Sequence, residues 1–303
     1  MDKRQAAAFE KRVNNTIEKY ELLSKRDKVL VACSGGKDST TTLYILHKLG
    51  YNVEALTIDL HIGDYSKRNI ENIRGFCREQ KIKLHLVDLR DEFGSSICYI
   101  REGIQGKKKL SNCTICGVVK RWILNRKARE LKATRLATGH NLNDESETVL
   151  MNLLKGNPKI GLGMGPKTGY TNDGSFVQRI KPLYFCTNDE VRAYSEFMGF
   201  PVVYEPCPCS VAVFRRKIRN ELKELEKAYP DIRLRLVRNF LRLLPGLRKR
   251  YSAAEKKSEK RGKAGKTGGE DEASRIGRCE LCGEPSRNKV CRLCNLIGIM
   301  KKR

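Results

Sequence analysis

The stretch KVLVACSGGKDSTTTLYILHKLGY, residues 28–51, decides the fold of this 303-residue chain. It opens with an apolar run that suits a buried parallel strand, and after Lys37 it has a helical pattern that Gly50 closes. The turn between them, residues 34–39, leaves backbone N–H groups pointing into one hollow at a helix N-terminus, where phosphate is favoured. We call it the phosphate loop. Its spacing fits neither G-x-x-x-x-G-K-S/T nor G-x-G-x-x-G, which excludes a Walker A loop and a dinucleotide fingerprint.

Strand and helix candidates continue to alternate beyond this stretch. Strands are predicted at 53–60, 83–89, 134–140 and 201–205, and helices at 4–24, 66–80, 115–131, 143–155 and 187–199. This alternation predicts an α/β fold with a doubly wound parallel sheet, in which ligands bind at the carboxyl ends of the strands.

The alternation stops near residue 214, and the chain divides into five predicted segments. They are an N-terminal helix at 1–27, the α/β domain at 28–213, a basic helical extension at 214–251, a linker at 252–274 and a cysteine module at 275–303. The extension is expected to form two basic helices broken near Pro230. The linker is poor in apolar residues and rich in Lys, Gly and Glu, so we expect it to be flexible.

The charge of the chain is strongly positive and unevenly distributed. There are 61 Lys and Arg against 35 Asp and Glu, a net charge of +26, and the residues from Phe214 onward hold 27 basic and 11 acidic side chains. Such a surface binds phosphate backbones by releasing counterions, so we predict a nucleic-acid partner. No run approaches the ~18 apolar residues of a membrane span, and the first 25 residues are unlike a signal peptide. We therefore expect a cytoplasmic location and no membrane partner.

Twelve cysteines in a reducing compartment indicate metal binding rather than disulfides. The four at the C-terminus follow the spacing C-x2-C-x8-C-x2-C, as Cys279, Cys282, Cys291 and Cys294. Two C-x-x-C knuckles joined by a short turn predict a tetrahedral site that holds Zn²⁺ structurally. A module of this size buries too little apolar surface to fold unaided, so the metal is expected to supply folding energy.

Two further cysteine groups lie within the predicted α/β domain. Cys113-x-x-Cys116 begins a helix, and Cys207-Pro-Cys209 follows the last predicted strand. Either group alone fits a redox pair or half of a metal site. Both fall at strand-to-helix edges on the side of the phosphate loop, so we expect them to converge there.

The phosphate loop resembles the pyrophosphate loop (PP-loop) of AMP-forming ATP pyrophosphatases. This resemblance implies a HUP-type fold that binds ATP with Mg²⁺, holding the β and γ phosphates while a substrate is adenylated at the α phosphate. The nucleotide-binding residues that it implies are Ser34, Gly35, Gly36, Lys37, Asp38, Ser39 and Gly139. Lys37 would neutralise the leaving pyrophosphate, and Asp38 would cap the helix or help to place Mg²⁺. Asp59, at the end of the second strand, contacts the nucleotide or caps the next helix, and His61 is a second candidate.

Four more motifs resemble the tRNA 2-thiolation branch of the PP-loop family, the TtuA-type enzymes. They are NCTICGVVKR at 112–121, TGHNLNDESET at 138–148, QRIKPL at 178–183 and Cys-Pro at 207–208. The resemblance implies that Cys113, Cys116 and Cys207 bind a 4Fe-4S cluster with one iron left without a protein ligand. Cys209 departs from the family pattern and is the alternative third ligand. A persulfide on one cysteine with a resolving thiol on another is the alternative without a cluster.

The same resemblance assigns roles to residues outside the cysteines. Lys120 and Asp144 would act near the reacting uridine, Lys120 on the α phosphate charge and Asp144 as a base or Mg²⁺ ligand. The alternatives are a surface lysine and an acid at a helix N-terminus. The motif usually reads D-D-E, and the first acid is Asn143 here. Arg179 and Lys181 would contact phosphate of tRNA or of the nucleotide.

Together these features imply an enzyme that adenylates the C2 oxygen of a tRNA uridine and replaces this oxygen with sulfur. The alternatives are cytidine 2-thiolation by a TtcA-type enzyme and a zinc-containing RNA-binding protein without catalysis. The expected partners are tRNA, a sulfur donor (sulfide or a thiocarboxylated ubiquitin-like protein) and a second copy of the chain. The family usually carries a further zinc module before the helix at 4–24, whereas this sequence starts directly with that helix, which leaves open which region of tRNA is gripped and therefore which uridine is modified.

Overall fold

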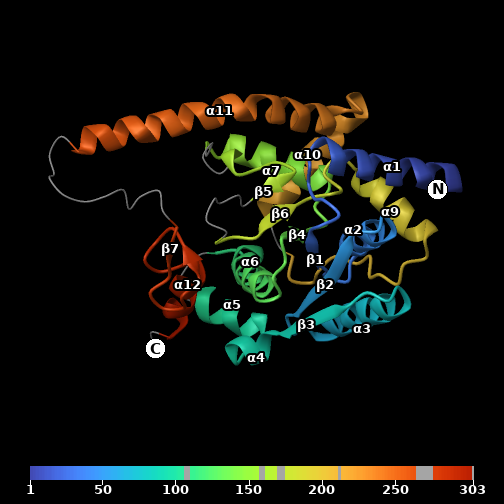
Figure 1. Cartoon of the computed structure of the whole chain (residues 1–303), viewed down its shortest axis with the longest axis horizontal. Helices are drawn as coiled ribbons and strands as arrows, with labels where there is room; N and C mark the ends of the chain where they lie inside the picture. Colours follow the sequence, from blue (N-terminus) through green and yellow to red (C-terminus); the bar gives the residue numbers. More distant parts are fainter. Residues whose placement is uncertain (106–109, 157–160, 169–174, 211–212, 264–275, 302–303) are drawn as a thin grey trace.

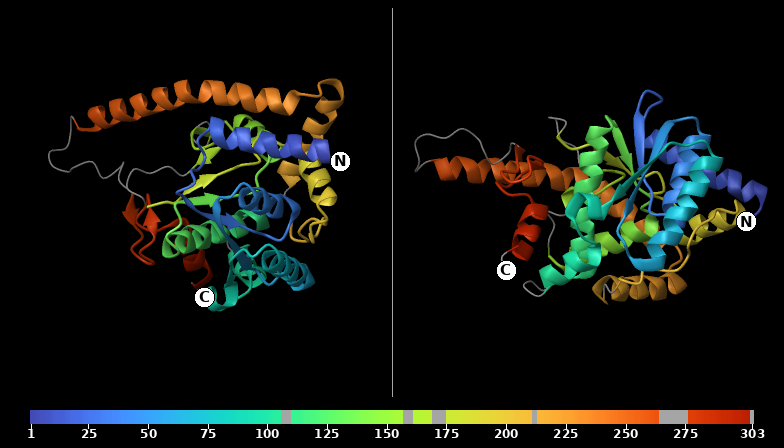
Figure 2. Two further views of the ribbon diagram at one scale, coloured as in Figure 1. Left: turned by 45° about the vertical axis from the view of Figure 1, so that its right-hand side comes forward. Right: turned by 90° about the horizontal axis from the view of Figure 1, so that it is seen from below.

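The computed structural model describes residues 1–105, 110–156, 161–168, 175–210, 213–263 and 276–301. Within these residues, the core is a six-stranded sheet in the order β3-β2-β1-β4-β6-β5, with helices on both faces (Figures 1 and 2). All neighbouring strands are parallel except β5 and β6. The predicted α/β fold with a doubly wound, mainly parallel sheet is confirmed.

The strand order places the site. The strands are β1 (Lys28–Ala32), β2 (Asn52–Asp59), β3 (Leu84–Asp88), β4 (Arg135–Ala137), β5 (Lys167–Thr168) and β6 (Gln178–Ile180). The chain steps outward from β1 to β2 and β3, and then returns to lay β4 on the other side of β1. This reversal between β1 and β4 opens the crevice in which doubly wound sheets bind ligands.

Alternating side chains of the strands build two apolar layers. Val29 and Val31 of β1 face one layer and Leu30 the other, and all three are buried. The first layer is covered by α1 (Lys3–Lys19), α2 (Lys37–Lys48), α3 (Gly63–Glu79) and α9 (Asn188–Phe197). The second layer is covered by α4 (Leu89–Phe93), α5 (Ile97–Gln105) and α6 (Asn112–Glu130). Both faces of β1 are therefore dry, as expected for a central parallel strand.

The remaining helices lie beside this sandwich. The helix α7 (Leu142–Leu154) packs against α10 (Val213–Ala228) and the long α11 (Ile232–Lys263), which runs along the top of Figure 1. The cysteine module consists of β7 (Gly277–Arg278), β8 (Pro285–Ser286) and α12 (Arg292–Lys301), and α12 packs against α5 and α6. No helix in the described part of the chain is long and apolar enough to cross a membrane.

Two predicted elements differ from the structure. Residues 201–205 form no strand: β6 takes the place beside β4, β5 lies beyond it, and Val202 N donates to Phe200 O (2.8 Å) in a tight turn at Pro201. The predicted linker at 252–274 begins inside α11, which continues to Lys263. The residues 253–263 are rich in Ala, Glu and Lys, which have high intrinsic helix propensity. The rest of the predicted linker, up to 274, lies outside the described residues.

Candidate active site

The phosphate loop lies between β1 and α2, at the reversal point of the sheet (Figure 1). Gly36 is the N-cap of α2, and no side chain of the described residues caps this helix end. The Ser39 hydroxyl accepts a hydrogen bond from Ser34 N (3.1 Å) and donates one to Gly36 O (3.0 Å), which fixes the turn. The first N–H groups of α2 therefore remain for an anion, which the helix dipole also favours.

Two glycines allow other backbone segments to lie directly on this loop. Gly35 has φ of +78°, and a Cβ there would lie 2.6 Å from the carbonyl oxygen of Asn69 in α3. Gly139 follows β4, and a Cβ there would lie 2.6 Å from the carbonyl carbon of Asp38. A side chain at either position would push the segments apart, so both glycines are required by the packing of the loop.

Lys37 and Asp38 form the polar centre of the loop. Lys37 Nζ lies 2.8 Å from both carboxylate oxygens of Asp38 and 2.8 Å from Asn188 Oδ1 at the start of α9. Asp38 Oδ1 also accepts a hydrogen bond from Asn141 Nδ2 (2.9 Å). Asp38 thus holds Lys37 rather than capping α2. The lysine side chain is 14% exposed and sits beside the free N–H groups, where it can reach a bound phosphate.

Asp59 and His61 lie at the carboxyl end of β2. Asp59 Oδ1 accepts a hydrogen bond from His61 N (2.8 Å), and the His61 ring bonds Asp88 Oδ1 (2.6 Å) at the end of β3. Asp88 is also the N-cap of α4. These bonds tie two loops together at the ligand edge of the sheet, and nucleotide contact by Asp59 stays a prediction.

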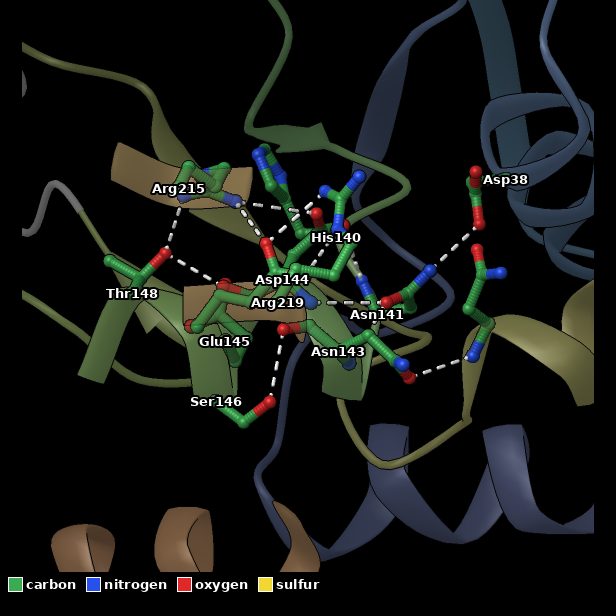
Figure 3. Close-up of polar contacts among 12 residues, drawn as sticks. Asp38, His140, Asn141, Asn143, Asp144, Glu145, Ser146, Thr148, Arg215 and Arg219 are labelled. Carbon is green, nitrogen blue, oxygen red and sulfur yellow. Dashed lines mark hydrogen bonds and ion pairs between the residues drawn. The ribbon is translucent and has the colours of Figure 1, made fainter. Parts of the chain in front are cut away.

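Asp144 lies in the first turn of α7 (Figure 3). It completes a capping box, because Asn141 Oδ1 accepts from Asp144 N (3.2 Å) and Asn141 N donates to Asp144 Oδ2 (3.4 Å). Its other oxygen, Oδ1, lies 3.6 Å from Arg215 Nη1 of α10. Asn141 also bonds Asp38, so the start of α7 is fastened to the phosphate loop. The side chain of Asp144 remains one-third exposed and able to meet a ligand.

A cluster of basic side chains lies beside this helix end. His140 keeps accessible surface, yet desolvation by surrounding protein and the charges of Lys181 and Arg215 lower its pKa to about 4, so the ring is neutral at pH 7. Desolvation also lowers the pKa of Arg179 in the same cluster. Lys181 pairs with the buried Glu145 at 2.7 Å. A cluster of this charge suits a phosphate group.

The structure brings the two cysteine groups of the α/β domain together. Cys113 and Cys116 lie in the first turns of α6, and Cys207 lies in the segment after α9. Burial raises the pKa of the Cys116 and Cys207 thiols, and the charge of Lys120 opposes this rise at both. The charge of Cys113 also raises the pKa of Cys116. Lys120 and the three predicted ligands therefore share one neighbourhood, and their roles stay a prediction.

Cys209 belongs to the same group. Desolvation acts to lower the pKa of Arg101 in α5, but a hydrogen bond to Cys209 raises it overall. Arg101 Nη2 also donates to Cys98 Sγ (3.2 Å), and the backbone of Cys209 hydrogen-bonds the Cys207 sulfur. Cys207 and Cys209 both lie near Cys116, so either can be the third ligand.

This donor set fits an iron–sulfur cluster. Thiolates are the ligands that such clusters take, and hydrogen bonds to their sulfurs tune them. Arg101 Nε is buried and has no hydrogen-bond partner among the described residues. With Lys120 it offers N–H donors and positive charge beside the thiols, which a bound anionic group would satisfy.

The phosphate loop and the cysteine group are connected through α3. Gly35 packs on Asn69, whose Nδ2 donates to Tyr65 O (2.7 Å). Burial raises the pKa of Tyr65, and nearby Cys207 raises it further. The turn that would hold ATP and the thiols that would hold the cluster are therefore both neighbours of α3.

The C-terminal cysteines form a compact four-sulfur site. All four sulfur atoms lie within 4.8 Å of one another, and the Sγ atoms of Cys282 and Cys291 are 3.7 Å apart. A tetrahedral Zn²⁺ with Zn–S bonds of about 2.3 Å requires sulfurs separated by about 3.8 Å. Cys279 Sγ and Cys291 Sγ accept backbone N–H groups, at 3.2 and 3.4 Å, as is usual for thiolates. The donor set and spacing therefore fit the predicted structural zinc.

The cysteine module is packed onto the helices that carry the other cysteines. Leu293 and Leu296 of α12 are buried in one apolar cluster with Ile104 of α5 and Ile115 of α6. The Glu284 carboxylate pairs with Arg129 of α6. Ile115 stands between Cys113 and Cys116 in sequence, so the module packs against the turn of α6 that carries these two cysteines.

We expect Cys291→Ser to remove zinc and to detach this module. Without the metal the hairpin and α12 have too small a core, and exposing Leu293 and Leu296 should lower the free energy of unfolding by about 3 kcal/mol. Elemental analysis should find about one zinc per chain in the wild type and none in the variant. Denaturant titration measures the free energy of unfolding, and proteolysis of the tail shows whether the module has detached. Cys98→Ser is the control and should keep zinc; a Cys291→Ser variant that keeps it contradicts the site.

Several residues of this site are not apparent from the sequence. Asn188 and Arg215 reach the phosphate loop and Asp144 from helices far along the chain, and Arg101 reaches Cys209 from α5. Asn141 lies inside a quoted motif, and the N-cap pattern before α7 was a signal for it.

Comparisons with known proteins agree with this geometry. A model of the PP-loop domain matches residues 5–226. A tRNA-5-methyluridine(54) 2-sulfurtransferase from Pyrococcus horikoshii is 34% identical over 97% of this chain and 86% of its own length. The cytoplasmic tRNA 2-thiolation protein 1 of Mus musculus is 32% identical over 96% of this chain and 65% of its own. The U34-tRNA thiolase NcsA from Methanococcus maripaludis, solved with its 4Fe-4S cluster, superposes with a TM-score of 0.71 at 31% identity over 81% of each chain.

The resemblance to the TtuA-type branch is thereby confirmed at the level of the family. The matched domain covers most of the chain and includes the phosphate loop, both catalytic-domain cysteine groups and Asp144. From this match and the relatives that extend over nearly all of its length, we conclude that the chain belongs to the PP-loop family, in the group of the tRNA 2-sulfurtransferases.

Proposed function

We propose that this protein is an ATP-dependent tRNA uridine 2-thiolase. The observation that carries the proposal is the position of α3 between the two groups: Gly35 of the phosphate loop packs on Asn69 of this helix, and Tyr65 of the same helix lies near enough to Cys207 for their charges to interact. A nucleotide-binding protein without catalysis has no use for this arrangement. Relatives named as tRNA 2-sulfurtransferases support the same reaction.

The reaction has two steps, adenylation and sulfur transfer. In the first, the C2 oxygen of uridine attacks the α-phosphorus of ATP, the bond to the β-phosphate oxygen breaks and pyrophosphate leaves. In the second, sulfide adds to C2, its proton passes to a base, the C2–O bond breaks and AMP leaves. The uridine thereby exchanges its C2 oxygen for sulfur, with no net oxidation or reduction.

The first step belongs to the phosphate loop. Its N–H groups and Lys37 would hold the β and γ phosphates, and this charge would stabilise the departing pyrophosphate. Asp38, which holds Lys37, would also help to hold a Mg²⁺ bound by the phosphates. Arg179 and Lys181, beside the neutral His140, would contact a phosphate of the nucleotide or of tRNA.

The second step belongs to the cysteine group and its neighbours. Cys113, Cys116 and Cys207 would hold a 4Fe-4S cluster, whose chemistry would be to carry sulfide to the activated C2. Lys120, whose charge acts to lower the pKa of the Cys116 and Cys207 thiols, would stabilise charge that develops at the α phosphate. Asp144 would take the proton that leaves the sulfur, or would help to hold Mg²⁺.

The tRNA would be held by the basic surface of the C-terminal half. Exposed cations of α10 and α11 project along these helices, at Arg216, Lys217, Lys223, Arg235, Arg238 and Arg242. Because α10 and α11 both pack against α7, these cations lie on helices that neighbour the one carrying Asp144. We further propose a cytoplasmic location, sulfide or a thiocarboxylated ubiquitin-like protein as donor, and a homodimer.

An anaerobic reaction of purified protein with ATP, Mg²⁺, sulfide and unmodified tRNA tests this function. We expect 2-thiouridine in the digested tRNA by mass spectrometry, with one AMP and one pyrophosphate formed per sulfur incorporated. Formation of 2-thiocytidine would indicate the cytidine reaction instead. Iron-loaded protein that binds tRNA but forms neither thionucleoside nor AMP would overturn the proposal.

A further inference from the structure

The first helix of the basic extension reaches the candidate active site through one side chain. Arg215 of α10 contacts three residues of the first turns of α7 (Figure 3). Its Nη1 lies 3.6 Å from Asp144 Oδ1 and 3.2 Å from Glu147 Oε2, and its Nη2 donates to Thr148 Oγ1 (2.8 Å). The planar guanidinium can bridge these groups, which a lysine ammonium can do less well.

Glu147 anchors α10 and does not depend on Arg215 alone. Its side chain is 1% exposed, and a buried carboxylate requires a close counter-charge. Arg219, one turn further along α10, supplies a two-point contact, from Nε to Oε1 (2.7 Å) and from Nη2 to Oε2 (3.2 Å). Either arginine can be removed while the other still neutralises Glu147.

Asp144 distinguishes the two arginines. Arg215 pairs with Asp144, whereas the hydrogen bonds of Arg219 go to Glu147 and Asp144 affects Arg219 only through its charge. The opposite oxygen of Asp144 faces Asn141, which bonds Asp38 of the phosphate loop. Figure 3 shows Asp144 held between these two sides, with Asp38 on one flank and Arg215 on the other. Arg215 thus supplies one of the two contacts that orient this carboxylate, and Asn141 supplies the other.

We propose that Arg215 is a positioning residue that holds Asp144 in the orientation required for tRNA thiolation. This inference rests on the proposed function and extends it to the basic extension, which thereby completes the active site as well as binding RNA. Misplacing a reacting group by about 1 Å can cost on the order of 100-fold in rate. The loss should appear in kcat rather than in the KM for ATP, because Lys37 and the phosphate loop do not touch Arg215.

The test compares Arg215→Ala with the matched control Arg219→Ala in the full chain loaded with its metals. Both variants remove one guanidinium from α10 and its contact with Glu147, and Arg219 makes the two-point contact, so a purely structural loss should be at least as large in Arg219→Ala. We expect Arg215→Ala to lower kcat for thiolation by roughly 10- to 100-fold at an unchanged KM for ATP. We expect Arg219→Ala to stay within about threefold, and Arg215→Lys to recover about tenfold over the alanine variant.

The outcomes separate this inference from the function on which it rests. Equal losses of kcat in both alanine variants, or a rise in the KM for ATP without a fall in kcat, would overturn the positioning role. Unfolding of Arg215→Ala is checked by melting temperature, and Arg215→Gln then provides the comparison, since it keeps a donor for Thr148 and removes the charge beside Asp144. A wild-type protein that makes no thionucleoside overturns the proposed function, and this inference with it.

Discussion

Replacing Cys116 with serine is expected to leave the protein without its iron and without thiolation activity. Cys116 lies in the second turn of α6. Its thiol is near enough to Cys113, Cys207, Cys209 and Lys120 for their charges to interact. A cluster that already has one iron without a protein ligand would keep only two thiolates, and serine is a poor ligand for it. Iron analysis should fall from about four per chain to near zero. Visible absorbance and tRNA nucleoside analysis should fall with it.

The zinc content and a neighbouring cysteine provide the controls for this result. Cys116→Ser should keep its zinc, because the four C-terminal sulfurs form a separate site. Cys98→Ser should keep both metals, since a serine can still accept the hydrogen bond from Arg101. Cys207→Ser is expected to lose iron and Cys209→Ser to retain it; the reverse pattern would assign the third ligand to Cys209. Full iron and full activity in Cys116→Ser would refute a cluster at this place.

The elements around the phosphate loop were predictable because their signals are local. Residues 28–51 carry an apolar run, a glycine turn and a periodic helix in one stretch, and β1 and α2 follow them closely. The strand predicted at 201–205 is wrong: whether an apolar run pairs depends on the rest of the sheet, and here β6 takes the place beside β4, with β5 at the edge. The strand β6 itself has three residues, of which Ile180 alone is fully buried, and so short a segment gives no clear pattern.

The active site was predictable only where its residues share a motif. The structure brings Cys116 and Cys207 together, but not at strand-to-helix edges: α6 follows α5, and Cys207 follows a segment that forms no strand. Asn188, Arg101 and Arg215 each act at a distance in sequence from their partners. Which side chains of α9, α5 and α10 reach the site depends on how these helices pack, and no local sequence pattern encodes that packing.

Replacing Lys37 with alanine is expected to lower kcat/KM for ATP by roughly 10²- to 10³-fold, the usual cost of removing one charge-stabilising donor from a transition state. Lys37 Nζ is held at the mouth of the phosphate loop by Asp38 and Asn188, each at 2.8 Å. On binding ATP it would exchange these partners for phosphate oxygens, so its loss weakens both binding and pyrophosphate departure. Pyrophosphate release at varied ATP, with tRNA saturating, measures the effect.

The fold should tolerate this change, which makes the result specific. Asp38 keeps its hydrogen bond from Asn141, so no buried carboxylate is stranded when Lys37 is removed. Lys48→Ala is the matched control, because this lysine lies at the far end of the same helix and pairs with Glu10 on the surface. It should leave ATP kinetics unchanged, and both variants should retain iron and zinc. If Lys37→Ala used ATP as well as Lys48→Ala does, the hollow at the start of α2 would not be where the β and γ phosphates bind.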